Sequence, residues 1–329
     1  MEFPAVFDDG VEAHLTSRGH CLITLRWWVQ NHRRNRKWFD KERLKFESDF
    51  EFDQEYGINW SARSGDAYFP EFIRRGTKFF TLPAPGVIPG LPIFRGWDFG
   101  TSRPAVVWGQ IDDTGRVWVL REIAPTNIDI HQFRDLVLYL SGQLEIEKLE
   151  QQSMTRALQI INEINNPESG YPETPWFQHS TGEWVDHGLP EAVRPSTIVT
   201  TTERTDADVL ASRGIYLQTA YVHLETREQV MRALLRRRPD GWPGIIWDPA
   251  CKQSLKMMNG GLTRKKDKKT GRTFGSEYNK PGLVDDLYDA HSAWLTQEID
   301  PAEFAEDGTI KRSKDIGEVD SYWNSINAA

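Results

Sequence analysis

Residues 93–123, IFRGWDFGTSRPAVVWGQIDDTGRVWVLREI, contain three short apolar segments rich in β-branched and aromatic residues. The segments cover 93–99, 105–111 and 117–123, and Asp112-Asp113-Thr114-Gly115 between the last two is typical of a turn. Strands joined by connections this short pair with their neighbours in the chain. The stretch therefore predicts a three-stranded antiparallel meander.

Beyond the meander, helical and strand patterns alternate. Helical spacing covers 128–150, 155–165, 205–212, 226–238 and 283–297, and short strand candidates cover 175–178, 215–219 and 244–247. A meander followed by this alternation predicts an α/β fold, with a mixed sheet that is antiparallel in its first strands, parallel in the rest and covered by helices.

The region before the meander is rich in proline and glycine. Pro83, Pro85, Pro89 and Pro92 exclude a helix in that part. A polar helical pattern precedes it from residue 36 to about residue 56, after a strand candidate at 22–28. We therefore expect an N-terminal arm over 1–65, a connector over 66–92, the sheet domain over 93–298 and an acidic, flexible tail over 299–329.

Composition limits the class of protein. The chain has 329 residues, 39% hydrophobic and 27% charged, which excludes wholesale disorder and coiled coil. Its net charge of −8 excludes a nonspecific polycation but not a local basic patch. Two cysteines, Cys21 and Cys251, give neither a disulfide framework nor a zinc spacing. No apolar run approaches the roughly 20 residues that cross a bilayer, so we expect a soluble, cytoplasmic protein with no membrane partner.

Asp98 interrupts the apolar first strand of the meander and is followed by Phe99-Gly100. An ionised carboxylate in apolar surroundings costs several kcal/mol unless a cation, hydrogen bonds or solvent compensate it. Hydrogen bonding at a strand end and a functional role both remain open for this residue.

A second group of acids, Asp285, Asp286 and Asp289, begins the last predicted helix. Residues three and four apart lie together on a helix surface, so these carboxylates repel one another. A solvated acidic turn is one interpretation, and a bound divalent cation is the other. With Asp98 they would suit two-metal phosphoryl transfer, and oxygen-only ligands favour two Mg²⁺ or Mn²⁺ ions.

A basic segment comes just before this acidic helix. A charged hairpin tip and a clamp for a phosphate backbone are both open interpretations. As a clamp it would lie at the rim of the acidic site. Its six bases are Arg264, Lys265, Lys266, Lys268, Lys269 and Arg272.

Several of these motifs together resemble the C-terminal nuclease domain of the large terminase subunit of tailed bacteriophages. The order and spacing of 96–100, 205–215, 244–251 and 285–290 carry the resemblance. Residues 52–60 and 69–72 resemble the junction between that family's motor and nuclease domains. The resemblance covers about residue 20 to residue 297.

The resemblance implies an RNase H-like endonuclease that cuts concatemeric viral DNA during packaging. Its metals would be held by acids on the first strand, a middle strand and the last helix. Asp98 matches the first position, and Asp285, Asp286 and Asp289 cover the last. At the middle position, where the family tends to have Asp, this chain has His179, with Glu183 and Asp186 just beyond. His179 as ligand or base, Glu183 as a shifted ligand and an ordinary surface histidine stay open.

The resemblance also implies partners. They would be double-stranded DNA, a motor ATPase domain or chain, the small terminase subunit and the portal, in the host-cell cytoplasm. No GxxxxGK[ST] phosphate loop occurs here, so residues 1–65 would correspond only to the end of a motor domain. The chain would then be part of a longer protein, a split product, or a nuclease working with a separate motor.

Two other functions remain open. His179 at the middle position would fit a packaging component that docks to motor, portal or DNA without cleaving. An RNase H-like resolvase or integrase is the third possibility.

Overall fold

The computed structural model describes residues 11–15, 21–43, 67–83, 86–100, 103–150, 155–166, 168, 170, 172–178, 182–193, 205–266, 273–279, 283–300, 302 and 304. His179, Lys268, Lys269, Arg272 and nearly all of the expected acidic tail lie outside these ranges.

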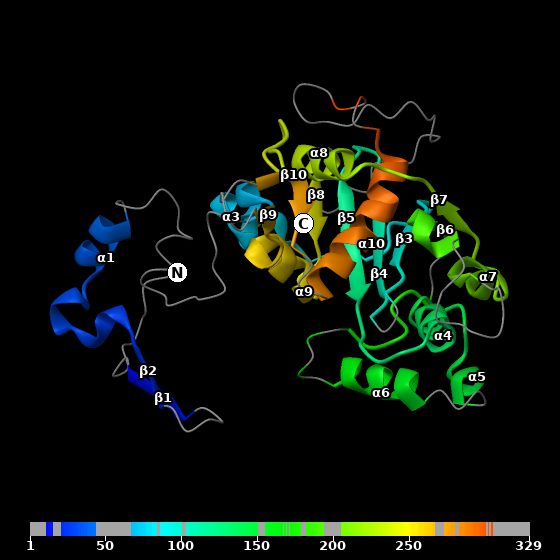
Figure 1. The fold of residues 1–329 in the computed structure, drawn as a ribbon, viewed down its shortest axis with the longest axis horizontal. Helices are drawn as coiled ribbons and strands as arrows, with labels where there is room; N and C mark the ends of the chain where they lie inside the picture. Colours follow the sequence, from blue (N-terminus) through cyan, green and yellow to red (C-terminus); the bar gives the residue numbers. More distant parts are fainter. Residues whose placement is uncertain are drawn as a thin grey trace.

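Six strands of the described chain form one mixed sheet in the order β7-β6-β3-β4-β5-β8 (Figure 1). Antiparallel pairs join β3 to β4 and β4 to β5, and parallel pairs add the other three strands. This arrangement confirms the predicted mixed sheet and its antiparallel meander. The strands are β3 (Ile93–Asp98), β4 (Ala105–Ile111), β5 (Val117–Ile123), β6 (Trp184–Gly188), β7 (Leu217–Thr219) and β8 (Ile245–Trp247).

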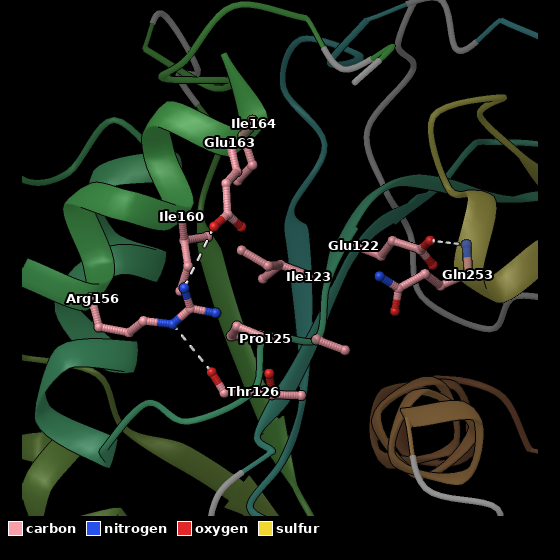
Figure 2. A pocket seen from close by; sticks show the side chains of 10 residues that line it. Glu122, Ile123, Pro125, Thr126, Arg156, Ile160, Glu163, Ile164 and Gln253 are labelled. Atoms are coloured by element: carbon pink, nitrogen blue, oxygen red, sulfur yellow. Dashed lines mark hydrogen bonds and ion pairs between the residues drawn. The ribbon is translucent and has the colours of Figure 1, made fainter. Parts of the chain in front are cut away.

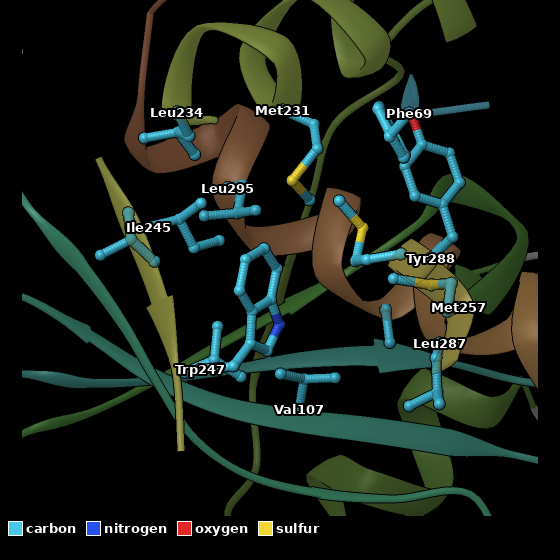
Figure 3. Packing of buried hydrophobic residues seen from close by; sticks show 14 of the residues in the cluster. Phe69, Val107, Met231, Leu234, Ile245, Trp247, Met257, Leu287, Tyr288 and Leu295 are labelled. Atoms are coloured by element: carbon cyan, nitrogen blue, oxygen red, sulfur yellow. The ribbon is translucent and has the colours of Figure 1, made fainter. Parts of the chain in front are cut away.

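Helices cover both faces of the sheet, because successive strand residues point to opposite sides and both sides are apolar. One buried cluster joins Phe94 and Val107 to α8 (Leu224–Leu234), α9 (Lys252–Lys256) and α10 (Leu283–Glu298). Figure 3 shows this layer around Trp247. The other cluster joins Trp97 and Trp108 to the helices of the second face. These are α4 (Ile130–Leu140), α5 (Ile146–Glu150), α6 (Thr155–Ile164) and α7 (Asp206–Ala211).

Local signals account for several helix boundaries. Thr205 caps α7 with a reciprocal capping box to Asp208. The single helix expected over 128–150 is instead two helices, α4 and α5. Gly142 has a φ of 73°, a left-handed conformation that ends α4 and separates it from α5.

The stretch expected to be a connector contributes to the core. It contains α3 (Pro70–Arg75) and the 3₁₀ helix η4 (Thr77–Phe80). Phe69, Phe72 and Phe80 are fully buried in the cluster around α10. The prolines therefore exclude a helix only over the later part of this region, and 67–83 packs with the sheet domain.

The described part of the N-terminal arm is a small unit. It has a hairpin of β1 (Val11–Leu15) and β2 (Cys21–Leu25), two 3₁₀ turns at Trp27–Val29 and Asn31–Arg33, and α1 (Arg36–Arg43). Trp27 stacks on Trp38 and packs against Phe39. Among the described helices, none combines the length and apolar character needed to cross a membrane.

Helix α10 lies directly on the sheet at two glycines. A Cβ atom at Gly96 would stand 2.0 Å from the Ala290 carbonyl oxygen and 2.5 Å from Trp294 Cδ1. At Gly109 it would stand 2.6 Å from Trp294 Cζ2. Because alternate strand residues share a face, Asp98 points to the same side as Gly96. This close approach fixes α10 over the end of β3.

We predict that Gly96→Ala lowers the free energy of unfolding by more than about 2 kcal/mol, because the clash is with backbone that cannot rotate away. Chemical denaturation measures the effect. Gly188→Ala is the matched control on the next strand, where the nearest atom is the flexible Leu217 Cδ1 at 3.2 Å. Equal stability of the two variants would contradict this account of the α10 contact.

Candidate functional site

The α10 contact brings two of the predicted acids to one end of the sheet. Asp98 is the last residue of β3, two residues beyond Gly96. Asp289 precedes Ala290, whose carbonyl lies against Gly96. Both carboxylates line one pocket of about 680 Å³. Acids far apart in the sequence therefore share a cavity, as the two-metal hypothesis requires.

The pocket also holds charged residues from other elements. Glu191, Arg227 and Lys265 line it, together with Tyr221 and Tyr278. The walls thus come from the ends of β3 and β6, from α8 and α10, and from the hairpin of β9 (Arg264–Lys266) and β10 (Thr273–Tyr278).

Asp289 is held in place by two side-chain donors. Its Oδ1 accepts a hydrogen bond from Tyr278 OH at 2.7 Å and from Arg227 Nη1 at 3.1 Å. All three residues are buried. Burial and then the Asp289 charge hold the pKa of Tyr278 well above its ordinary value, so the phenol stays a donor.

Asp285 and Asp286 are also buried in the first turn of α10. Asp286 Oδ2 lies 3.8 Å from Arg103 Nε, on the connection that follows β3. Asp285 Oδ1 is buried and accepts no hydrogen bond from the described residues. Leaving a buried carboxylate oxygen without a donor is costly, so this Asp285 oxygen would be stabilised by an added donor or cation.

These acids fit a hard divalent cation by their chemistry, since carboxylate oxygens are the ligands that Mg²⁺ and Mn²⁺ prefer. Within the described ranges, no three acidic, histidine or cysteine side chains already converge on one metal position. The metal roles of Asp98, Asp285, Asp286 and Asp289 remain predictions.

The middle strand lies later than the sequence predicted. Residues 176–178 form a turn, and the strand beside β3 is β6, with Ile93 opposite Trp184 and Trp97 opposite Gly188. The Glu183 carbonyl accepts from Ile93 N–H, so Glu183 lies at the start of β3. This is the opposite end from Asp98, and Glu183 does not join the pocket.

Asp186 is directed away from the site. It lies on the other face of the sheet, where its carboxylate accepts from Arg95 Nε at 2.6 Å and Nη2 at 2.8 Å. Trp97 Nε1 donates to it as well, at 2.7 Å. Both charges are buried and satisfied by each other, which makes this pair structural.

Glu191 is the residue that sequence reasoning missed. It is exposed, three residues beyond the end of β6, in the 3₁₀ helix η6 (Pro190–Val193), and it lines the pocket with Asp98. The sequence signal for Glu191 would have been its place just after β6, the short strand that pairs parallel with β3. Sequence reasoning did not select Glu191 because it placed this strand at 175–178.

The described part of the basic segment is β9, which pairs antiparallel with β10 to form a hairpin. Lys265 lines the pocket and lies at its rim, with Nζ 2.6 Å from Glu277 Oε2 and about half its side chain exposed. Lys266 is exposed on the same strand. Arg264 is instead held by the protein, because it donates to the Gly275 carbonyl and pairs with Glu228.

Comparisons with known proteins add weak similarities. No protein-family model matches the chain, and no curated protein does. The structure of the large terminase from a thermophilic bacteriophage aligns over 80% of this chain and 52% of its own, at 12% identity and a TM-score of 0.39. The large-terminase nuclease domain from bacteriophage SPP1, solved with bound Mn, aligns over 63% and 87%, at 13% identity and a TM-score of 0.35. The chain spans about half the length of the thermophilic phage protein.

A second pocket, of about 300 Å³, contains none of the predicted site residues (Figure 2). Its walls are mainly apolar, and Arg156 Nε donates to the Thr126 carbonyl there. At its edge the buried Glu122 accepts from Gln253 N–H at 2.6 Å and Ser254 N–H at 3.0 Å. Burial raises the pKa of Glu122 from 4.5 to about 7, against the opposing effect of these donors.

We predict that Glu122 makes the protein less stable as the pH rises. The folded state keeps a proton that the unfolded state releases from pH 4.5 upward, so stability falls until the folded pKa of about 7 is passed. Relative to Glu122→Gln, the wild type should lose about 3 kcal/mol between about pH 4 and about pH 8.

Urea unfolding of both proteins across this range measures the difference. His291, whose burial lowers its pKa to about 3, titrates alike in both and cancels. A difference that does not change with pH would contradict the prediction.

Proposed function

We propose that this chain is a divalent-metal-dependent DNA endonuclease that cuts concatemeric viral DNA during genome packaging. The observation that carries the proposal is the shared pocket, in which Asp98 from the first strand and Asp289 from the last helix lie near Lys265 at the rim. Acids inside a cleft with a base at its edge suit a polyanionic substrate that is cleaved with the help of bound metal ions.

Asp98, Glu191 and Asp289 would hold the cations, with Asp285 and Asp286 adding negative charge from the same helix turn. Their donor atoms are all carboxylate oxygens, which favours Mg²⁺ or Mn²⁺. Two such ions, when bound, would lower the pKa of the attacking water and neutralise the leaving oxygen. Glu191 is exposed and lines the same pocket as the other two.

The hairpin would hold the DNA backbone. Lys265 pairs with Glu277 on the neighbouring strand, and both side chains are about half exposed. Such surface pairs contribute only about 0–1 kcal/mol. A phosphate can therefore replace Glu277 at little cost. Lys266, and Lys268, Lys269 and Arg272 beyond it in the sequence, would extend the contact along the backbone with little sequence preference.

The proposed partners follow from the same function. A packaging nuclease would act with a motor ATPase, a small terminase subunit and a portal in the host-cell cytoplasm. The buried acids of α10 favour cleavage over a purely docking role, because Asp285 Oδ1, which has no donor among the described residues, could accept charge from a cation.

We predict that Asp98→Asn and Glu191→Gln each lower Mn²⁺-dependent cleavage of plasmid DNA by about 100-fold or more, since each removes a charged metal ligand. The readout is conversion of supercoiled to linear DNA over time. Glu183→Gln is the matched control, an exposed glutamate at the other end of β6. It should cut as fast as the wild type.

Two results would contradict these assignments. Full activity in Asp98→Asn would remove the proposed metal site. Loss of activity in Glu183→Gln but not in Glu191→Gln would mean that the middle metal ligand lies in the segment before β6.

We predict that Lys265→Ala weakens duplex binding and lowers the slope of log affinity against log salt by about 1, because one phosphate contact is lost. Fluorescence anisotropy in Ca²⁺ at several salt concentrations gives the slope. Lys148→Ala is the control, an equally exposed lysine on α5 that pairs with Glu145 away from the pocket. An unchanged slope for Lys265→Ala would place the DNA elsewhere.

A further inference from the structure

We propose that Arg227 is a built-in counter-cation that competes with the divalent metal for Asp289. The inference rests on the proposed function, because it concerns the same acidic pocket. Arg227 places a positive charge where the metal would bind, and this charge lowers the affinity of the pocket for the metal.

The position of Arg227 supports this role. It belongs to α8 and lines the pocket that contains Asp98 and Asp289. Its Nη1 donates to Asp289 Oδ1 at 3.1 Å, and its Nε donates to the Val222 carbonyl at 3.1 Å. The second bond fixes the direction of the guanidinium. Arg227 is 8% exposed and Asp289 is 9% exposed, so water screens their attraction poorly.

Arginine is suited to this role because it keeps its charge at every accessible pH. A dication bound to Asp289 would lie within a few ångströms of the guanidinium, and the two positive charges would repel each other. Tyr278 donates to the same oxygen, but its phenol is a neutral donor. It holds the carboxylate in place without opposing the metal. The two donors to Asp289 are therefore predicted to have different effects on metal affinity.

A purely positioning role for Arg227 predicts the opposite result. If the guanidinium only aimed the carboxylate, its removal would disorder Asp289 and weaken metal binding. Competition predicts tighter binding when the charge is removed. The sign of the change in affinity therefore separates the two roles.

Calorimetric titration of the full chain with MnCl₂ tests the proposal without DNA or cleavage. Arg227→Gln should bind Mn²⁺ about tenfold more tightly than the wild type, because a unit charge beside the site is gone. Arg227→Met removes the same charge and keeps the aliphatic stem, and serves if the Gln variant does not fold. Arg227→Lys keeps a charge there and should stay within about threefold of the wild type.

Arg236→Gln is the matched control, since it removes one exposed arginine two residues beyond α8 and outside the pocket. It should leave the affinity unchanged. Tyr278→Phe should not tighten binding. Weaker or equal binding by both Arg227→Gln and Arg227→Met would overturn the competition while leaving the metal site standing. No Mn²⁺ binding by the wild type or any variant would overturn both the competition and the proposed function.

Discussion

The contact between α10 and the backbone of β3 at Gly96 is the constraint on which the rest of the structure depends. With no side chain at this position, the Ala290 carbonyl can lie against the strand. The helix then covers the core cluster around Trp247 and delivers Asp289 to the end of β3 that carries Asp98. One close approach thus serves both the packing of the layer and the assembly of the pocket.

Much of this arrangement was predictable from sequence, because the strands of the meander and the final helix are long and periodic. Their apolar patterns indicated β3, β4, β5 and α10 with boundaries within one or two residues of the structure. The acids at the ends of β3 and α10 followed from these boundaries. The break between α4 and α5 was missed because Gly142 looks tolerable inside a helical pattern, although its left-handed conformation ends the helix.

The middle strand shows where sequence reasoning fails. β6 has five residues, of which Asp186 and His187 are polar yet buried, so its pattern lacks the apolar run expected of a central strand. Only tertiary partners explain them: Arg95 pairs with Asp186 on one face and Glu298 with His187 on the other. A strand defined by its partners cannot be recognised from local periodicity. Misplacing it moved attention from Glu191 to Glu183.

Buried carboxylates have different partners on the two faces of the sheet. Asp186 has a bidentate arginine and a tryptophan N–H, which together satisfy it without solvent. In the first two turns of α10, three carboxylates are buried: Asp285, Asp286 and Asp289. Arg227 pairs with Asp289 at 3.1 Å, and the pairing of Arg103 with Asp286 is long at 3.8 Å. Carboxylates held this close together repel one another, which lowers stability. A bound dication would relieve this repulsion and would compete with Arg227 at Asp289. Part of the acid that makes the chain negative overall thus lies in this pocket, beside the basic strand β9.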